Sequence, residues 1–371
     1  MTTDLPLSMA AAVLTGHGGL DRLEYRVDWP VPQPRPGAVL IHVGACGVNN
    51  TDINTRTGWY SPTVTTGTTT EGGRSGFEQV VDELGAWGDA VTFPRIQGAD
   101  IVGRVVAVGE GVGEDWLGAR VMVDPWLRDP EDPMNRDKAG FVGSECDGGF
   151  AQFACIPAYN VHRVESPWTD EELATFACSY VTAENMLTRA RVKKGETLLI
   201  TGASGGVGSA LVQLAKRRQA IVLGLAGTKK MEQVRALGAD AVFPRDVPNL
   251  EAAVADATGR DTVDVAADVV GGTGFARLLA ILRRGGRYVT SGAIGSPVVE
   301  LDLRTLYLKD LELIGATVTT PEIFPNLLRY IEAQEIRPLL AKAYPLSEIH
   351  EAQSDFLKKD HVGKLVLVPP A

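Results

Sequence analysis

The chain has 371 residues, of which 44% are hydrophobic, and its formal net charge is −10. This length predicts about two domains with buried cores, and the acidic balance argues against a nucleic-acid partner. No apolar run approaches a membrane span of about 18 residues, the first residues lack the pattern of a signal peptide, and four cysteines are too few for a disulfide framework, so a cytoplasmic setting is expected.

The first part of the chain, about residues 10–163, reads as short β-segments separated by proline and glycine. Strands are expected at Val39–Val43, Ile101–Val108 and Phe150–Ile156. Between them, Ser61–Thr92 starts with almost no apolar residues and is predicted to be a long loop, with a short helix over Phe77–Trp87. The loop is either functional or a surface insertion.

The middle part, about residues 171–317, alternates strands and helices. This alternation predicts βαβ units and a doubly wound parallel sheet. The expected strands are Thr197–Thr201, Ala220–Leu225, Ala241–Phe243, Val263–Val269, Arg287–Ser291 and Leu313–Thr317. The last part has two amphipathic helical stretches and a final strand, at Ile323–Gln334, Leu346–Lys359 and Gly363–Val368.

A glycine-rich turn follows the first strand of the middle part and opens a helix. The turn matches the dinucleotide fingerprint G-x-G-x-x-G, except that alanine replaces the first glycine. In that context the helix N-terminus would bind a pyrophosphate, although an ordinary tight turn has the same pattern. The residues predicted to bind the cofactor here are Ala203, Ser204, Gly205, Gly206, Val207 and Gly208.

The end of the second strand indicates which dinucleotide is bound. An NAD site usually places an acidic residue about 20 residues beyond the glycines, where it binds the ribose 2′-hydroxyl. Here that position has no acidic residue, and Thr228, Lys229 and Lys230 follow, with Arg245 after the third strand. Hydroxyl and cationic groups suit a 2′-phosphate, so these residues predict NADP(H), although the lysines also fit a solvated helix start.

The chain resembles the medium-chain dehydrogenase/reductase superfamily over nearly its whole length. The resemblance rests on the glycine turn and on four further segments, Pro36–Val43 with Ala45–Asn49, Gly98–Val112, Asp147–Gln152 and Val362–Val366. It implies a GroES-like β-barrel catalytic domain, formed by residues 1–173 and 318–371, around a Rossmann cofactor domain at 174–317. It also implies a homodimer, extended through the strand at Leu313–Val318.

Zinc members of this superfamily have Cys, His and Cys ligands at the positions of Asn49, Ala99 and Cys178. A catalytic zinc needs three protein ligands, so Cys178 alone cannot hold one. The structural zinc lobe needs four clustered cysteines, and Asp124–Cys146 contains only Cys146. We therefore predict no metal.

The segment Gly47–Tyr60 resembles the zinc-independent quinone oxidoreductase branch. The resemblance implies hydride transfer from NADPH to a small-molecule substrate, a quinone or an α,β-unsaturated carbonyl compound. Tyr60 is the expected proton and hydrogen-bond donor to the carbonyl oxygen, and Asn49 would bind that carbonyl or orient the nicotinamide. Because the Ser61–Thr92 loop follows Tyr60, it is expected to border the substrate cleft, where tryptophans 59, 87 and 126 either line the cleft or pack together.

Further contacts with the nicotinamide half of the cofactor follow by position in the family. The matching residues lie on the helix after residue 176 and at the ends of the fourth and fifth strands: Thr182, Val270, Gly271, Gly292 and Ala293. Three other functions stay open: an enoyl-thioester reductase, a zinc-type alcohol dehydrogenase, and an NADPH-binding module without turnover.

Overall fold

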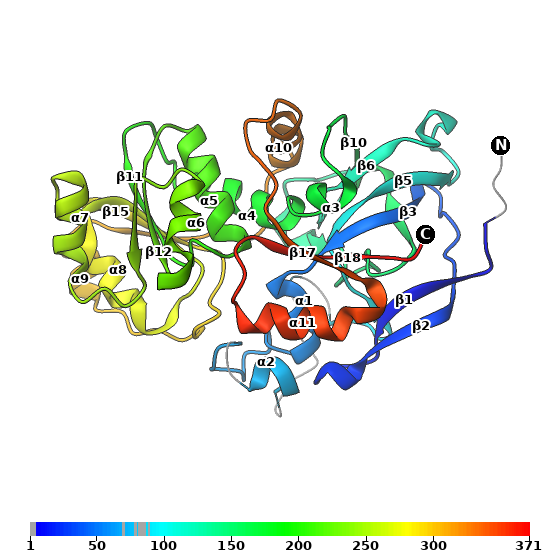
Figure 1. The fold of residues 1–371 in the computed structure, drawn as a ribbon, viewed down its shortest axis with the longest axis horizontal. Helices are drawn as coiled ribbons and strands as arrows, with labels where there is room; N and C mark the ends of the chain where they lie inside the picture. Colours follow the sequence, from blue (N-terminus) through cyan, green and yellow to red (C-terminus); the bar gives the residue numbers. More distant parts are fainter. Residues whose placement is uncertain (1–4, 69–70, 78–79, 81–86, 88–89) are drawn as a thin grey trace.

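A computed structural model describes residues 5–68, 71–77, 80, 87 and 90–371 of the chain. The molecule has two lobes, one built on a parallel sheet and the other on mainly antiparallel sheets (Figure 1). The described part of the chain begins and ends in the antiparallel lobe (Figure 1). In the described part of the chain, no helix is long and apolar enough to cross a membrane.

The first lobe holds the six-stranded parallel sheet, with strand order β13-β12-β11-β14-β15-β16. Its central strands are buried on both faces, which explains their continuous apolar runs. The strands are β11 (Thr197–Ile200), β12 (Ile221–Ala226), β13 (Ala241–Pro244), β14 (Val263–Asp268), β15 (Leu282–Thr290) and β16 (Glu312–Gly315). The doubly wound sheet expected from the sequence is therefore confirmed.

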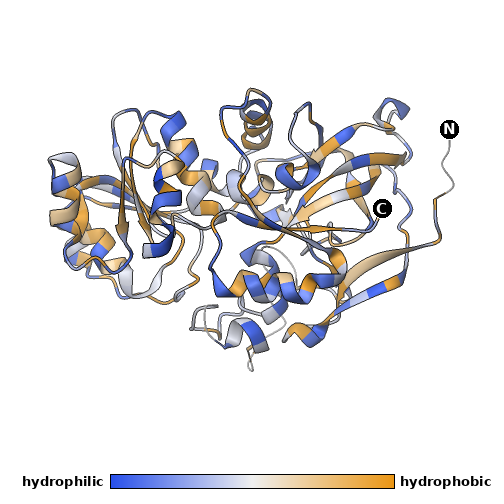
Figure 2. Cartoon of the chain, viewed as in Figure 1, coloured by the Kyte–Doolittle hydropathy of each residue, from blue (hydrophilic) through white to orange (hydrophobic). Residues whose placement is uncertain are grey.

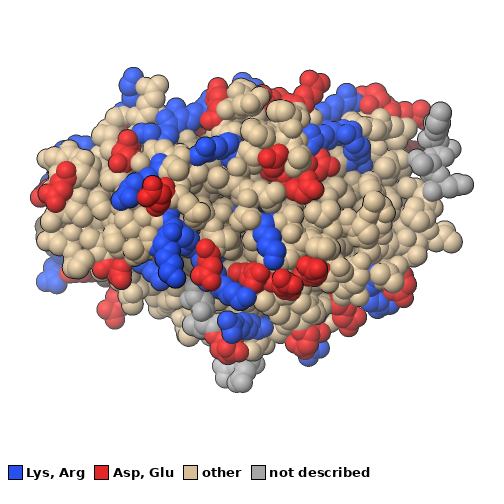
Figure 3. All heavy atoms as spheres, viewed as in Figure 1, with Lys and Arg blue, Asp and Glu red and all other residues tan. Residues whose placement is uncertain are grey.

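Helices cover the parallel sheet and turn their apolar sides toward it, as the hydropathy colouring shows (Figure 2). They are α5 (Gly206–Arg217), α6 (Met231–Ala236), α7 (Leu250–Thr258) and α8 (Phe275–Ile281). Helix α9 (Leu303–Leu308), which contacts α8, has no buried residue. On the face of the molecule seen in Figure 3, acidic and basic side chains are interspersed over both lobes.

The second lobe is built around a seven-stranded sheet in which the two ends of the chain meet. Strand β18 (Lys364–Val368) pairs with β3 (Ala38–Gly47) and runs parallel to β17 (Leu340–Pro345). The remaining strands of this sheet are β5 (Asp100–Val108), β6 (Arg120–Val123), β9 (Phe153–Pro157) and β10 (Val161–Arg163). This sheet joins the N- and C-terminal parts in one lobe.

Smaller elements complete the second lobe. One three-stranded sheet and one two-stranded sheet flank the main sheet: β1 (Ser8–Leu14), β2 (Leu23–Pro30) and β4 (Arg95–Ile96), and β7 (Trp126–Leu127) with β8 (Gly140–Phe141). The helices are α1 (Asn50–Thr57), α2 (Gly72–Ser75), α3 (Asp170–Leu173), α10 (Ile323–Glu332) and α11 (Ile349–Lys358). The short helix expected over Phe77–Trp87 lies mostly outside the described residues.

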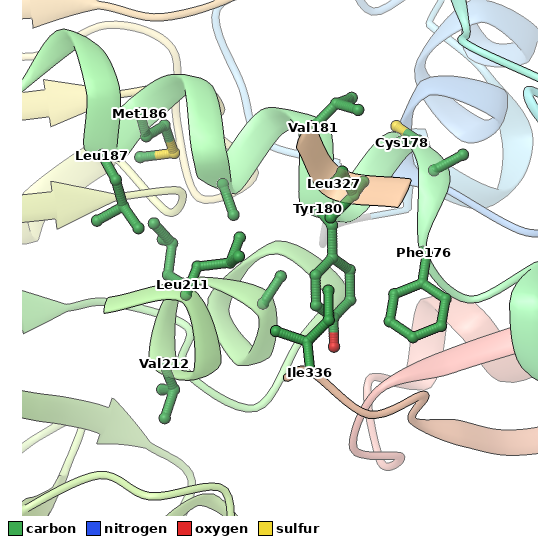
Figure 4. Packing of buried hydrophobic residues seen from close by; sticks show 14 of the residues in the cluster. Phe176, Cys178, Tyr180, Val181, Met186, Leu187, Leu211, Val212, Leu327 and Ile336 are labelled. Carbon is green, nitrogen blue, oxygen red and sulfur yellow. The ribbon is translucent and has the colours of Figure 1, made fainter. Parts of the chain in front are cut away.

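Helix α4 (Ala177–Arg189) joins the lobes through a shared core. Tyr180 and Met186 of α4 pack among residues of α5 and α10, including Leu211 and Leu327 (Figure 4). The Tyr180 hydroxyl donates to the carbonyl oxygen of Arg337 at 3.1 Å. This packing fixes α4, and with it Cys178, between the two sheets.

Candidate cofactor and substrate site

A cavity of about 610 Å³ opens at the carboxyl ends of the parallel strands. Open α/β sheets bind their ligands at this edge. Its volume suits an extended dinucleotide better than a small metabolite alone. Of the residues predicted from sequence, the cavity is lined by Ser204, Gly205, Gly206, Val207, Gly208, Lys230, Arg245, Val270 and Gly271.

The glycine turn has the close packing that its sequence predicts. A Cβ atom on Gly208 would lie 2.1 Å from the Gly202 carbonyl oxygen, so only glycine lets α5 approach the strand. A Cβ atom on Gly205 would meet only that oxygen, at 3.5 Å, and would otherwise occupy open space. Gly205 is also the residue before the first turn of α5, whose free N–H groups therefore face the cavity.

Ala203 lies under the turn rather than in the cavity. Its side chain is fully buried, and its N–H donates to the Leu225 carbonyl oxygen at 3.1 Å. The methyl group packs over Gly224, where a Cβ atom would lie only 3.1 Å away. The alanine in the first glycine position therefore serves the packing of β11 on β12.

The short turn after β12 brings only one of its three predicted phosphate ligands to the cavity. Residues 228–230 form a single 3₁₀ turn, in which consecutive side chains point in different directions. Thr228 and Lys229 are exposed and do not line the cavity, whereas Lys230 does. Arg245 lines the same end of the cavity, just after β13.

A second lysine, which the sequence analysis did not identify, reaches the cavity from α11. Lys359 follows this helix, and its ammonium donates to Asn50 Oδ1 at 2.9 Å. The Lys230 ammonium in turn donates to the Lys359 carbonyl oxygen at 2.7 Å. Burial and the neighbouring ammonium of Lys230 lower the pKa of Lys359 to about 7. Asn50, Lys359 and His361 all line the cavity, so the last part of the chain closes it.

The cations at this end of the cavity have no carboxylate partner within ion-pairing distance in the described part of the chain. No salt bridge joins Lys230, Arg245 or Lys359 to a described carboxylate, although most other lysines and arginines of the chain make one. Arg245 is exposed, whereas Lys230 and Lys359 are half-buried, and charge withdrawn from water is costly unless a ligand compensates it. The arrangement therefore fits an anionic ligand.

At the ends of β14 and β15 the cavity is lined by two loops, and Asp268 holds the first of them in place. Asp268 accepts hydrogen bonds from Val270 N at 2.9 Å and from the Tyr288 hydroxyl at 2.7 Å. The second loop reaches the cavity at Ile294–Ser296, and the predicted Gly292 and Ala293 do not line it. The bridge between Gly271 and Ser296 explains this offset, because it brings the later residues of the loop to the rim. Thr182 also does not line the cavity, and its hydroxyl donates to Cys178 O at 2.7 Å.

Asn49 belongs to a buried polar network instead of facing the cavity. Its Nδ2 donates to Asp100 Oδ2 at 2.9 Å, and its Oδ1 accepts from the Lys364 ammonium. Lys364 also pairs with Asp100 Oδ2 at 2.7 Å, with side-chain exposures of 3% and 0%. Both ends of the Asn49 amide are thus engaged, which leaves it to position its neighbours rather than to bind a carbonyl directly.

Asp100 and Asp52 extend this network. Asp100 Oδ1 accepts from Cys178 N at 2.5 Å, at the start of α4. Asp52 caps α1 by accepting from Asn49 N at 2.7 Å. Burial raises the pKa of Asp52 to about 7, and the ammonium of Lys364 opposes that rise.

These side chains do not fit a zinc ion. At the three family ligand positions the chain has an engaged amide, a methyl group and the Cys178 thiol, whose pKa burial raises well above its ordinary value. The Lys364 ammonium, a cation, lies among them. Among the described residues, no three His, Cys, Asp or Glu side chains gather closely enough to hold a metal.

Tyr60 does not line the main cavity and lies in a cluster of aromatic rings. Its ring is 5.2 Å from that of Trp87, which packs on Trp126 and Phe141 at 5.7 and 4.7 Å. Tyr60 also lines a separate small pocket of about 10 Å³ with Asn54 and Ser61. Burial raises the pKa of the Tyr60 hydroxyl above its ordinary value, so the hydroxyl keeps its proton at neutral pH. The three tryptophans therefore pack together around the predicted donor.

Comparisons with known sequence families agree with both lobes. Residues 35–166 match the family described as alcohol dehydrogenase GroES-like domain, and residues 206–333 match the family described as zinc-binding dehydrogenase. Among curated proteins, the chain is 28% identical to quinone oxidoreductase of Homo sapiens, over 99% of this chain and 100% of that protein. It is 26% identical to NAD-dependent alcohol dehydrogenase of Saccharolobus solfataricus, over 91% and 94%.

Solved structures include a protein from Sinorhizobium meliloti 1021 whose assignment as an alcohol dehydrogenase is itself provisional. It is 48% identical, with a TM-score of 0.88 over 99% of this chain and 98% of that one. A 2-octenoyl-CoA carboxylase reductase, solved with NADP and 2-octenoyl-CoA, is 25% identical with a TM-score of 0.84, over 98% of this chain and 88% of that one.

Proposed function

Because the chain belongs to the medium-chain dehydrogenase/reductase superfamily, and is an oxidoreductase with a nicotinamide cofactor, we propose that it is an NADPH-dependent, zinc-independent reductase of quinones or α,β-unsaturated carbonyl compounds. The observation that carries this proposal is the buried network of Asn49, Asp100 and Lys364. This network of hydrogen bonds and an ion pair occupies the region where zinc members of the superfamily have their metal ligands. The cytoplasmic location expected from the cysteine content stays a prediction.

The preference for NADPH rests on the cationic end of the cavity. Lys230 follows β12, at whose end an NAD site has an acidic residue, and Arg245 follows β13. Lys359 adds a third positive charge from α11. A 2′-phosphate would compensate these charges, whereas the 2′-hydroxyl of NADH would not.

The chemistry of the proposed reaction is divided between cofactor and chain. A bound nicotinamide supplies the hydride. As negative charge develops on the acceptor oxygen, the Tyr60 hydroxyl is the group we propose to donate a hydrogen bond and then the proton. The hydroxyl is protonated at neutral pH, and because burial raises its pKa, the phenolate left after proton donation must be stabilised or reprotonated. The half-buried ring of Trp87, which packs on Tyr60, offers a flat apolar surface to a quinone or an enone.

A second candidate function is reduction of an enoyl thioester. The similarity to the 2-octenoyl-CoA carboxylase reductase favours it. The interspersed charges on the face seen in Figure 3 offer no large basic surface there for the phosphates of coenzyme A. Turnover of crotonyl-CoA in the assay below would select this candidate.

The first experiment titrates chelator-treated protein with NADPH and NADH and then measures cofactor oxidation with 1,4-quinones, 2-alkenals and crotonyl-CoA. We expect tighter binding of NADPH and metal-free turnover of a quinone or alkenal. A Tyr60→Phe variant should bind NADPH like wild type and lose about 10²–10⁴-fold in kcat. Preference for NADH, activity only with added zinc, or binding without any turnover would each contradict the proposal.

We also propose that the protein is a homodimer that extends its parallel sheet through β16. The edge strand and the neighbouring α9 expose apolar side chains, among them Leu303, Tyr307 and Leu313. An exposed edge strand is a template for pairing with a second chain. Leu313→Lys should shift the mass measured by sedimentation from dimer to monomer, whereas Val27→Lys, an exposed position on β2, should not. A monomeric wild type would contradict the proposal.

A further inference from the structure

Residues Val64–Thr68, here called the strap, cross from the second lobe to the loop that lines the cofactor cavity. The strap begins four residues after Tyr60, in the segment that the sequence marks as an insertion. Within it, Val64, Gly67 and Thr68 are buried and Thr65 and Thr66 are exposed. A short turn, in which Val64 N donates to Ser61 O at 3.0 Å, leads into it.

Gly67 is where the strap meets the other lobe. A Cβ atom on Gly67 would lie 2.3 Å from the Ile294 carbonyl oxygen and 2.4 Å from that of Gly295. Both contacts are with backbone, which cannot move aside as a flexible side chain can. Beside them, the Ser296 hydroxyl donates to the Thr65 carbonyl oxygen at 3.4 Å. The strap therefore lies directly on residues 294–296, and only glycine permits that approach.

The same loop forms part of the cavity wall. Ile294, Gly295 and Ser296 line the cavity, and Gly295 N donates to Val270 O at 2.8 Å. Gly272 N donates to Ser296 O at 3.1 Å. The loop is thus held between the strand end at Val270 on one side and the strap on the other.

Trp59 anchors the strap on the side of the predicted donor. Its indole Nε1 donates to the Thr66 carbonyl oxygen at 2.8 Å, and its ring packs edge-on against Tyr60 with 5.6 Å between centroids. A continuous series of contacts therefore runs from Tyr60 through Trp59 and the strap to the cavity wall.

We propose that Trp59 and Gly67 are positioning residues, which hold the loop Ile294–Ser296 against the bound cofactor and thereby slow its release. The proposal rests on the proposed function, since it requires that NADPH occupy this cavity. It gives the insertion a role in cofactor retention. The strap contacts Trp59 and the loop Ile294–Ser296, whereas the cationic end of the cavity is lined by Lys230, Arg245 and Lys359, so loss of these strap contacts should speed the release of NADPH and NADH to a similar extent.

The test measures NADPH dissociation by stopped-flow fluorescence in wild type and in Gly67→Ala, with Gly16→Ala as the matched control. A Cβ atom on Gly16 would meet nothing within 4 Å. We expect Gly67→Ala to release NADPH about tenfold faster and to raise its KM without lowering kcat, because the methyl group pushes the strap off the loop. Gly16→Ala should behave like wild type.

A second variant keeps the test valid if Gly67→Ala folds poorly. Trp59→Phe keeps an aromatic ring and removes the N–H donor, and should speed release roughly threefold; Trp29→Phe, in the three-stranded sheet, is its control. If both strap variants bind NADPH and release it at the wild-type rate, the role of the strap in cofactor retention is contradicted while the proposed function stands. A wild type that binds neither cofactor would overturn the proposed function and this inference together.

Discussion

The protonation of Lys359 depends on whether an anion is bound in the cavity. Without a bound anion, burial and Lys230 lower its pKa to about 7, so it is mostly protonated at pH 6 and mostly neutral at pH 8. A phosphate favours the protonated form. We therefore expect the NADPH affinity of wild type, relative to Lys359→Gln, to fall by up to about tenfold from pH 6 to pH 8.

The measurement is a fluorescence titration of both proteins at each pH. Taking the ratio of the two affinities removes the ionisation of the cofactor itself, because that ionisation is common to both proteins. A ratio that stays constant over this range would contradict the assignment of Lys359 to the cofactor site.

At the scale of elements, two glycines of the unit β11–turn–α5 have different roles. Gly208 allows the helix to pack closely on the strand, whereas Gly205 leaves space at the cavity wall. Gly208→Ala places a methyl group against the Gly202 carbonyl oxygen, so we expect the free energy of unfolding to fall by about 1–3 kcal/mol. Gly205→Ala places its methyl group in open space at the cavity wall and should stay within about 1 kcal/mol of wild type.

Cofactor affinity should respond differently in these two variants. Gly205→Ala should weaken NADPH binding, because its methyl group takes up space at the cavity wall. Its urea unfolding curve should stay close to that of wild type. Equal losses in the free energy of unfolding of the two variants would contradict the prediction that the contact with the Gly202 carbonyl oxygen makes Gly208→Ala the less stable variant.

At the scale of the whole molecule, Lys364 joins three separate parts of the chain. It lies on β18 and pairs with Asp100 of β5, which in turn accepts from the first turn of α4. Removing one partner of a buried pair leaves the other charge uncompensated, so Lys364→Met should cost about 3–5 kcal/mol of stability in urea unfolding at pH 7.

Lys358→Met is the control for this variant, because Lys358 pairs with Asp355 at the surface and its side chain is 54% exposed. An exposed pair contributes about 0–1 kcal/mol, so the control should unfold near wild type. Equal losses in the two variants would mean that the buried network does not hold the parts together.

Much of the parallel-sheet lobe was predictable because its signals are local. The alternation of apolar strands and amphipathic helices, and the glycines that end β11, depend on residues within a few positions of one another. For the same reason Lys230 and Arg245 were predicted from the sequence as cofactor ligands, and both line the cavity. The same pattern does not predict the 3₁₀ turn that directs Thr228 and Lys229 away from the cavity.

Residue types at short spacing were enough to predict the βαβ lobe, the glycine turn, the family and the missing zinc ligands. Three features could be seen only in the folded chain: Lys359 reaches the cavity from the end of α11, Lys364 and Asp100 engage the Asn49 amide, and Gly67 lies against residues 294–296. Most of these contacts join residues more than 200 positions apart, such as Lys359 with Asn50 and Lys364 with Asn49. The sheet in which the two ends of the chain meet brings those pairs together, and the packing of the two lobes brings Gly67 against residues 294–296.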